Sequence, residues 1–260
     1  MTLAGRVALV TGGSSGIGRA AARLLARDGV KVAIIGTNEE EVNNAAKEIQ
    51  AVGGEVLPLV LDVSNEGDVR KGIDRTVTRW GRLDFVFANA GINGRWAPIE
   101  ELEPEDWDQV QAVNLRGTFL TVKYAVPHLK VHGGSIVVTS SVNGTRMFSN
   151  VGASAYATTK AGQVAFTKMM ALELGKDKIR VNVICPGAID TPINTKTDRS
   201  ALEDEPPLAE YPQGAIPLTE GEPGTADQVG ELVKFLFSDA SSHISGTEIW
   251  IDGAQSLLQG

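Results

Sequence analysis

The chain has 260 residues, of which 42% are hydrophobic and 22% charged, and its formal net charge is −8. This composition excludes a mainly disordered chain, and the negative charge without a Lys/Arg run excludes nucleic acid as the expected partner. No apolar run approaches the roughly 20 residues of a membrane span, and the first residues lack the pattern of a signal peptide, so we expect a cytoplasmic protein without a membrane partner.

Seven short runs rich in Val, Ile and Leu alternate with longer stretches typical of helices. The runs are 7–11, 31–35, 56–61, 85–88, 135–139, 180–184 and 248–251. Several are apolar without alternation, which suits parallel strands covered on both faces. No linker or composition break divides the series. The sequence therefore predicts an α/β fold in one domain, residues 1–260: a Rossmann-type doubly wound parallel sheet of seven strands with helices on both faces.

The first predicted strand is followed by the glycine-rich stretch Thr11-Gly12-Gly13-Ser14-Ser15-Gly16-Ile17-Gly18, and a helical pattern follows directly. Glycines in such a turn let the backbone approach a pyrophosphate closely and direct free amide groups at it. The glycine spacing differs from the common dinucleotide fingerprint, so a plain tight turn between strand and helix is the alternative.

The end of the second predicted strand bears on the choice of nicotinamide cofactor. An acidic residue there selects NAD by binding the ribose 2′-hydroxyl, whereas a nearby arginine accommodates the 2′-phosphate of NADP. Gly36 stands where the acid is usual, and Thr37 where an arginine is frequent. The missing carboxylate favours NADP. NAD is the alternative, because the acidic residues 39–41 would repel a 2′-phosphate.

Candidate catalytic residues follow in the middle of the chain. Tyr156 and Lys160 are four residues apart in a helical stretch, which places both on one helix face. A tyrosine with a pKa of about 10 is a poor base at neutral pH unless an ammonium group within about 4 to 6 Å stabilises its phenolate. In isolation, such a spacing is more often an exposed Tyr/Lys pair on an amphipathic helix. Asn114 lies in an earlier helical stretch, and Ser140 and Ser141 follow the fifth predicted strand.

Two further features complete the chemical survey. Cys185 lies among apolar residues at the end of the sixth predicted strand, which favours a structural role over a reactive thiol. His128, His132 and His243 form no cluster with the spacing of metal ligands, so we expect no metal.

The stretch 190–222 breaks the regular alternation. It carries several prolines and acidic clusters, so any helix in it must be short. It follows the carboxyl end of the sixth strand, where open α/β sheets bind ligands. We therefore interpret it as a substrate lid, with a disordered insertion as the alternative.

Taken together, these motifs resemble the short-chain dehydrogenase/reductase family. The glycine turn, Asp62, the Asn89-Ala90-Gly91 turn, Asn114, Tyr156 with Lys160, and Pro186-Gly187 occur in the family's order. The resemblance implies a catalytic set of Asn114, Ser141, Tyr156 and Lys160. It also implies a dinucleotide site formed by Gly12, Ser14, Ser15, Gly16, Ile17, Gly18, Thr37, Asp62, Val63, Asn89, Ala90, Gly91, Tyr156, Lys160, Pro186, Gly187, Ile189 and Thr191.

Within this resemblance, Tyr156 exchanges a proton with the substrate oxygen, Ser141 polarises that oxygen, and Lys160 lowers the tyrosine pKa and grips the nicotinamide ribose. Asn114 holds a helix kink and a water. Ser141 lies fifteen residues before Tyr156, which is about two more than the family pattern. We therefore expect an insertion in the loop 145–152.

The sequence thus predicts an NAD(P)-dependent oxidoreductase that interconverts a small-molecule carbonyl and a secondary alcohol. A 3-oxoacyl-(acyl-carrier-protein) reductase is the first alternative, although no basic patch offers itself to an acidic carrier. A catalytically silent nucleotide sensor or scaffold is the second. The resemblance also implies a homotetramer.

Overall fold

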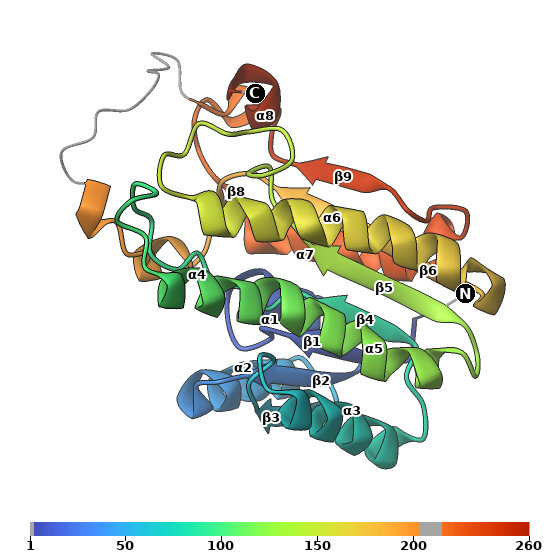
Figure 1. The fold of residues 1–260 in the computed structure, drawn as a ribbon. Coiled ribbons are helices and arrows are strands. Elements are labelled where there is room, and N and C mark those ends of the chain that lie inside the picture. Colours follow the sequence, from blue (N-terminus) through green and yellow to red (C-terminus); the bar gives the residue numbers. More distant parts are fainter. Residues whose placement is uncertain (1–2, 203–214, 260) are drawn as a thin grey trace.

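A computed structural model describes residues 3–202 and 215–259 of the chain. Its centre is a parallel sheet of seven strands in the order β3-β2-β1-β4-β5-β6-β9 (Figure 1). The strands are β1 (Val7–Thr11), β2 (Lys31–Gly36), β3 (Val56–Val60), β4 (Phe85–Ala88), β5 (Gly134–Thr139), β6 (Ile179–Pro186) and β9 (Glu248–Ile251). The predicted doubly wound sheet of seven parallel strands is confirmed.

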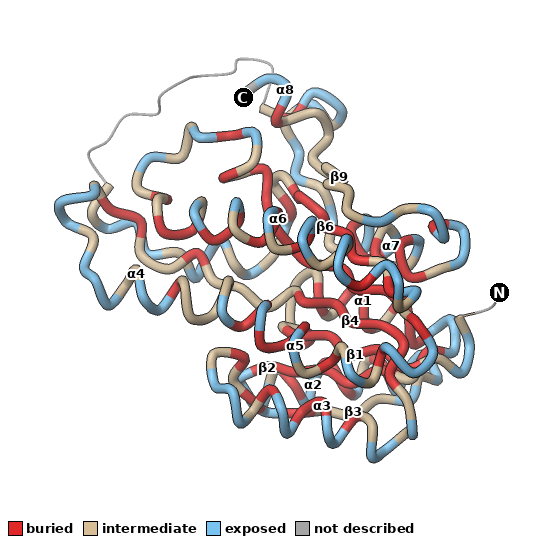
Figure 2. Tube along the Cα trace, turned by 45° about the vertical axis from the view of Figure 1, so that its right-hand side comes forward, coloured by how far each residue is buried: buried red, intermediate tan, exposed pale blue. Residues whose placement is uncertain are grey.

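Helices cover both faces of this sheet, and the central strands between them are buried, whereas the edge strands β3 and β9 are mostly half-buried (Figure 2). On one face lie α1 (Gly16–Arg27), α2 (Glu39–Ala51) and α7 (Ala226–Phe237). On the other lie α3 (Glu66–Trp80), α5 (Gly117–Leu129) and α6 (Ser154–Leu174). The short α4 (Pro104–Val110) precedes α5, and α8 is Gln255–Gln259. Each face of the sheet contributes strand side chains to one of the two apolar cores, so the strands are apolar on both faces.

The strand order reverses at β1, which pairs with β2 on one side and with β4 on the other. The connection after β1 leads to β2 and the connection after β4 leads to β5, so the two leave in opposite directions along the sheet. In open parallel sheets such a reversal opens a crevice at the carboxyl ends of the strands, and ligands bind there. The glycine turn after β1 and the Asn89-Ala90-Gly91 turn after β4 both lie at this crevice.

Two strands were not predicted from the sequence. β7 (Ile189–Asp190) and β8 (Gly224–Thr225) pair in parallel as a separate small sheet. Between them lies the predicted lid. Its described parts, 190–202 and 215–222, hold only single turns of 3-10 helix at Asn194–Lys196, Ser200–Leu202 and Pro217–Thr219. The expectation of short helices holds for these parts, and residues 203–214 lie outside the described structure.

A buried carboxylate joins the starts of β1 and β4. The Asp84 side chain is 1% exposed and accepts hydrogen bonds from Arg6 (2.8 Å), Arg82 (2.6 and 2.8 Å) and the Val7 amide (2.9 Å). Burial alone would raise the pKa of Asp84, but the bonds from Arg82, Arg6 and Val7 outweigh it and lower the pKa. The charged form is therefore the one that stabilises the fold.

Asp84→Ala should lower the free energy of unfolding at neutral pH by about 3 kcal/mol, since it removes a buried acceptor with charged donors. Because the folded-state pKa is depressed, this contribution is present above the unfolded pKa of about 3.9 and is lost as the pH falls through the folded value. Urea unfolding of both proteins at pH 7 and in acid measures it. The exposed Asp74→Ala is the control, expected within about 0.5 kcal/mol of wild type. A gap that does not narrow in acid would contradict this account.

Candidate active site

The glycine turn after β1 provides a close backbone approach at the crevice. Gly12 and Gly16 have positive φ angles of 63° and 48°, a conformation that residues with a Cβ atom rarely adopt. A Cβ atom on Gly18 would overlap the carbonyl oxygen of Gly12 and lie 2.7 Å from the Asn89 side-chain nitrogen. These glycines therefore form a cradle that a side chain would fill, and the residues present fit a dinucleotide pyrophosphate at the start of α1.

Gly18→Ala should raise the dissociation constant of the nicotinamide dinucleotide at least tenfold. The added Cβ atom would overlap the Gly12 carbonyl oxygen, so the backbone of the glycine turn must shift. Fluorescence titration with the reduced cofactor measures this change. Gly175→Ala is the matched control, since a Cβ atom there meets nothing within 4 Å. Equal affinities of the two variants would show that the turn tolerates a side chain and does not hold the pyrophosphate.

Asn89 ties the ends of three strands together. Its side-chain nitrogen donates to the Thr11 carbonyl (3.2 Å), and its side-chain oxygen accepts from the Thr139 hydroxyl (3.1 Å). The Thr11 hydroxyl in turn accepts from the amides of Asn89 and Ala90 (3.0 and 3.1 Å). These bonds hold the carboxyl ends of β1, β4 and β5 together and fix the floor of the site.

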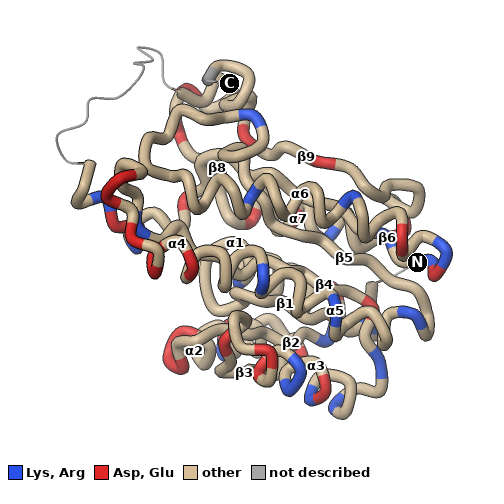
Figure 3. The backbone as a smooth tube through the Cα atoms, viewed as in Figure 1, with Lys and Arg blue, Asp and Glu red and all other residues tan. Residues whose placement is uncertain are grey.

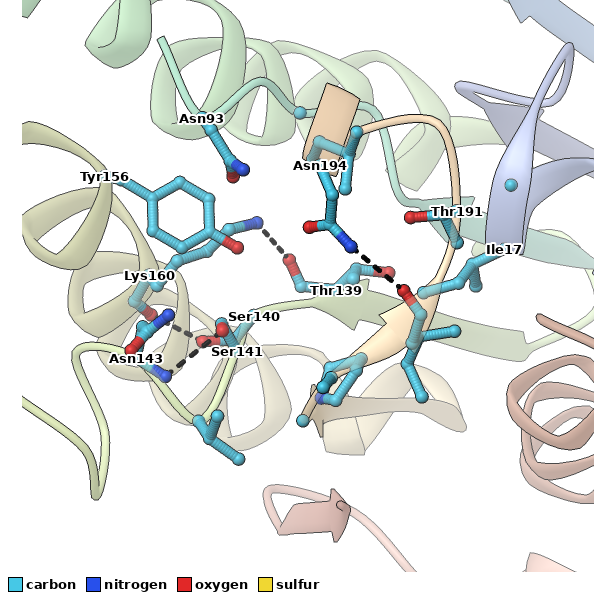
Figure 4. A pocket seen from close by; sticks show the side chains of 18 of the residues that line it. Ile17, Asn93, Thr139, Ser140, Ser141, Asn143, Tyr156, Lys160, Thr191 and Asn194 are labelled. Atoms are coloured by element: carbon cyan, nitrogen blue, oxygen red, sulfur yellow. Dashed lines mark hydrogen bonds between the residues drawn. The ribbon is translucent and has the colours of Figure 1, made fainter. Parts of the chain in front are cut away.

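Tyr156 and Lys160 lie on one face of α6 and point toward the end of β5, where Ser141 follows the strand (Figure 4). Tyr156 is 9% exposed, Lys160 3% and Ser141 6%. The Lys160 ammonium lies 5.3 Å from the centroid of the Tyr156 ring and donates to the Thr139 carbonyl (2.8 Å). The structure thus brings the three predicted catalytic side chains together.

Burial dominates the acid–base properties of this pair. It raises the pKa of Tyr156 to about 12, against a smaller lowering by the hydrogen bond with Ser141. It lowers the pKa of Lys160 to about 7. Burial therefore outweighs the expected lowering of the Tyr156 pKa by Lys160. The reason is that desolvation penalises the phenolate and the ammonium alike.

Asn114 is fully buried behind the catalytic pair, at a break in the helix regularity. The turn Gln111–Arg116 is π-helical and joins α4 to α5, which agrees with the predicted kink. The Asn114 side chain accepts from the Ile92 amide (2.8 Å) and donates to the Ile92 carbonyl (2.9 Å) and the Thr159 hydroxyl (3.1 Å). It therefore fixes the chain after Gly91 against α6.

A cavity of about 340 Å³ lies at the carboxyl ends of the strands. In Figure 4, Asn93 and Tyr156 lie on one side of it and Ile17 and Thr191 on the other. Most of the predicted site residues line this cavity: Gly12, Ser15, Gly16, Ile17, Asn89, Ala90, Gly91, Ser141, Tyr156, Lys160, Pro186, Gly187, Ile189 and Thr191.

Five predicted cofactor residues are not among its described lining: Ser14, Gly18, Thr37, Asp62 and Val63. Gly18 acts through the shape of the turn. The Asp62 carboxylate accepts from the amide and hydroxyl of Ser64 (both 2.8 Å), and Val63 is buried in the core. Their contacts with the adenosine half of a dinucleotide stay predictions.

The sequence also indicates 93–96, 145–152 and 190–222 as walls of the substrate pocket, and Asn93, Trp96, Met147, Asn150, Asn194 and Arg199 from these stretches line the cavity. The lining residues Asn143 and Gln255 lie outside these stretches and were missed. Most of these lining residues lie on irregular segments, where no periodic pattern marks which side chains point inward. Asn143, two residues after Ser141, is the one that a motif could have indicated.

The described part of the chain also bears on metal binding, on membrane-spanning helices and on the role of the single cysteine. Residues 3–202 and 215–259 contain no group of three His, Cys, Asp or Glu side chains that could hold a metal ion. The same ranges contain no helix long and apolar enough to cross a membrane. Burial raises the pKa of Cys185 to about 11. This thiol is therefore protonated at neutral pH, as suits a structural residue.

A glycine cradle at the switch point, beside a buried serine, tyrosine and lysine, defines a dinucleotide-dependent oxidoreductase. A family model described as enoyl-(acyl carrier protein) reductase matches residues 12–254. The chain belongs to the short-chain dehydrogenase/reductase family, and it is an oxidoreductase that interconverts alcohols and carbonyls with a nicotinamide cofactor.

Relatives with different substrates resemble the chain over nearly its whole length. It is 38% identical to levodione reductase of Leifsonia aquatica, over 96% of this chain and 94% of that protein. A crystal structure of a 3-ketoacyl-ACP reductase from Sinorhizobium meliloti is 52% identical, with a TM-score of 0.92 and coverage of 97% and 99%. A 3-ketoacyl-(acyl-carrier-protein) reductase from Brucella melitensis, solved with NADH, is 31% identical, with a TM-score of 0.86 and coverage of 98% and 99%.

Proposed function

We propose that Tyr156 is the general acid and base of this oxidoreductase, assisted by Ser141, Lys160 and Asn114, and that the substrate is a small polar carbonyl compound or secondary alcohol. The observation that carries the proposal is the buried cluster of Tyr156, Ser141 and Lys160 in the same cavity as the glycine cradle. A dinucleotide bound there supplies hydride to a carbonyl carbon or accepts it from an alcohol.

In the reducing direction, Tyr156 donates the proton that the carbonyl oxygen needs as it becomes an alcohol. The Ser141 hydroxyl donates a hydrogen bond to the same oxygen and so stabilises the developing negative charge. The charged form of Lys160 stabilises the phenolate that remains after proton transfer. Asn114 keeps the chain after Gly91 in place against α6. In the oxidising direction the same groups act in reverse.

NADP is the proposed cofactor, with NAD as the alternative. The β2 strand ends at Gly36 without a carboxylate, and a Cβ atom there would lie 2.6 Å from the Ser14 hydroxyl. A side chain at this position would crowd Ser14 and Val42, and Gly36 itself carries no carboxylate that could repel a 2′-phosphate. The Brucella relative that was solved with NADH supports the alternative. The ratio of the dissociation constants for NADPH and NADH decides between them.

A 3-oxoacyl-(acyl-carrier-protein) thioester is the second candidate substrate. The names of the Sinorhizobium and Brucella relatives favour it. Acidic side chains around α2 and α4 (Figure 3) oppose the docking of an acidic carrier on that side of the molecule.

The proposal is tested by following the oxidation of NADPH and NADH with ketones, aldehydes, keto acids and a 3-oxoacyl thioester. Turnover of a small carbonyl compound, faster than that of the thioester, is the expected result. A strong preference for the thioester would establish the second candidate instead. If no substrate is turned over while the cofactor still binds, a nucleotide-sensing or scaffold role takes its place.

A homotetramer is also part of the proposal. Apolar side chains are exposed on the outer sides of α5 and α6, with Phe119 45%, Met169 61% and Leu172 81% exposed. Contact between copies of these helices would cover them. Light scattering should give the mass of four chains, and a monomer mass at micromolar concentration would refute this part.

A further inference from the structure

The cavity differs in charge from the rest of the molecule. The chain has 32 acidic and 24 basic residues, yet none of the described residues that line the cavity is acidic. The lining contains two basic side chains, Lys160 and Arg199. A cavity without carboxylates in an acidic protein favours negatively charged ligands. At the glycine turn, the pyrophosphate of the cofactor accounts for the lack of carboxylates. Arg199 does not belong to the glycine turn.

Arg199 is one of the lining residues that do not belong to the predicted dinucleotide site. Six of these other residues are Asn93, Trp96, Asn143, Met147, Asn150 and Arg199. Four of these six residues carry an amide or a guanidinium group, so the wall offers many hydrogen-bond donors. Asn93 and Asn150 already donate one hydrogen bond each, to Thr197 and Asn143 (both 2.7 Å). The second N–H group of each amide and the Arg199 guanidinium can donate to a substrate with several oxygens, whereas a long acyl chain offers them no acceptor.

The structure holds Arg199 in place. Its guanidinium carbon lies 4.2 Å from the centroid of the Trp96 ring, and Trp96 is 4% exposed. The segment before it is fastened to the same loop, because the Trp96 amide donates to the Asp198 carbonyl (2.9 Å) and Asn93 donates to the Thr197 hydroxyl (2.7 Å). A stacked guanidinium group keeps its N–H edge available for a planar anion.

Arg199 also has a free charge in the described structure. Among the described residues, no carboxylate lies within the 4.0 Å that defines an ion pair for Arg199, whereas its neighbour Arg95 is paired with Asp106 at 3.6 Å. Arg199 is solvent-exposed, so a ligand can reach it. A guanidinium group that is stacked in place, and that has no ion-pair partner within 3–202 and 215–259, is suited to bidentate recognition of an oxyanion.

We propose, on the basis of the proposed function, that the substrate carries a second, anionic group, and that Arg199 binds it while Tyr156 and Ser141 hold the reacting oxygen. The substrate class is therefore a keto acid or the corresponding hydroxy acid. The proposed anionic group is a carboxylate. A phosphonate is also an oxyanion, and two N–H groups of a guanidinium can bind it in the same way. Reduction adds hydride from the nicotinamide to the ketone carbon and a proton from Tyr156 to its oxygen, and leaves the anionic group unchanged.

The test compares keto acids with their methyl esters, namely 4-oxopentanoate, 5-oxohexanoate and the matching phosphonates, on wild type, Arg199→Met and Arg199→Lys. Wild type should prefer the acids at least tenfold in kcat/KM. Arg199→Met should abolish this preference by raising KM for the acids, so that acids and esters are reduced with equal kcat/KM. Arg199→Lys should keep part of the preference for acids, because the positive charge remains but the two parallel N–H groups of the guanidinium are lost. If wild type prefers the phosphonates but not the carboxylates over the esters, the anionic group of the substrate is phosphate-like and not a carboxylate.

Arg146→Met is the matched control. Arg146 also stacks on a tryptophan, with its guanidinium carbon 3.6 Å from the Trp250 centroid, but it is not among the residues that line the cavity. This variant should keep the wild-type preference for acids over esters. If Arg146→Met loses the preference as Arg199→Met does, the effect is a general loss of surface charge and the proposal fails.

Two further measurements separate this inference from the proposed function. Calorimetric titration of the cofactor-loaded protein with the acids and esters reports binding whether or not turnover occurs. Equal binding of acid and ester to wild type overturns the inference, even if esters are reduced and the proposed function stands. If Arg199→Met instead weakens NADPH binding tenfold, Arg199 is a cofactor residue and the inference is again overturned.

Discussion

Tyr156→Phe should lower kcat by about a thousandfold, within the range of roughly 10² to 10⁴ that a positioned general acid contributes. The variant loses one oxygen atom, the only group of this side chain that can donate a proton. Because the ring stays, the packing of α6 against β5 and the cavity shape are kept. Affinity for the dinucleotide should therefore stay within about threefold of wild type, since the lost hydroxyl acts on the substrate oxygen.

Steady-state kinetics and a cofactor titration on the same protein preparation measure both quantities. Tyr124→Phe is the control, because Tyr124 is a tyrosine of α5 whose hydroxyl bonds to Glu66 at the surface. It should leave kcat unchanged. If Tyr156→Phe retains more than a tenth of the wild-type kcat, another group transfers the proton and the mechanism is wrong.

Lys160→Ala should have the second largest effect, a loss of roughly a hundredfold in kcat. With an effective dielectric constant of about 20, a charge 5.3 Å from the ring centroid stabilises the phenolate by about 3 kcal/mol, which corresponds to that factor. The variant also leaves the Thr139 carbonyl without its donor. Lys168→Ala, two turns further along the same helix and paired with Glu248, should keep the wild-type kcat.

The pH dependence tests the same role. Lys160 has a pKa lowered to about 7 by burial, and the charged form is the active one. For reduction, kcat/KM should therefore be level below about pH 7 and fall as the pH rises through this value. Tyr156, with a pKa of about 12, stays protonated over this range and does not limit the donor form. In Lys160→Ala the fall should be absent. A fall at the same pH in that variant would assign it to another group.

The main sheet could be predicted closely from the sequence, because strands buried on both faces must be short apolar runs. β1, β4 and β9 begin and end at the predicted residues, β2, β3 and β5 differ by one residue at one end, and β6 is longer by one residue at its start and two at its end. The pair β7 and β8 could not be predicted. Each is only two residues long, and their pairing depends on the tertiary contact between distant segments rather than on local pattern.

The site was predicted in the same uneven way. Tyr156 and Lys160 could be paired because their spacing of four residues has a geometric meaning on a helix. The segment 190–222 was expected beside the substrate, but Arg199 and Asn194 could not be singled out within it, because a segment without regular structure has no period that marks the inward side chains. The pKa of Tyr156 was expected in the wrong direction, because desolvation depends on what covers the side chain and a sequence does not contain that information.

The cavity has two kinds of wall, and they differ in how freely they can evolve. The cofactor side is formed by the ends of strands and by glycines whose exchange would disturb the sheet. The substrate side is formed by residues such as Asn150 and Arg199 on irregular segments outside the two apolar cores. Substitutions at such exposed positions usually change stability by less than about 0.5 kcal/mol. New substrate preferences can therefore arise by a few loop mutations while the hydride chemistry is inherited intact.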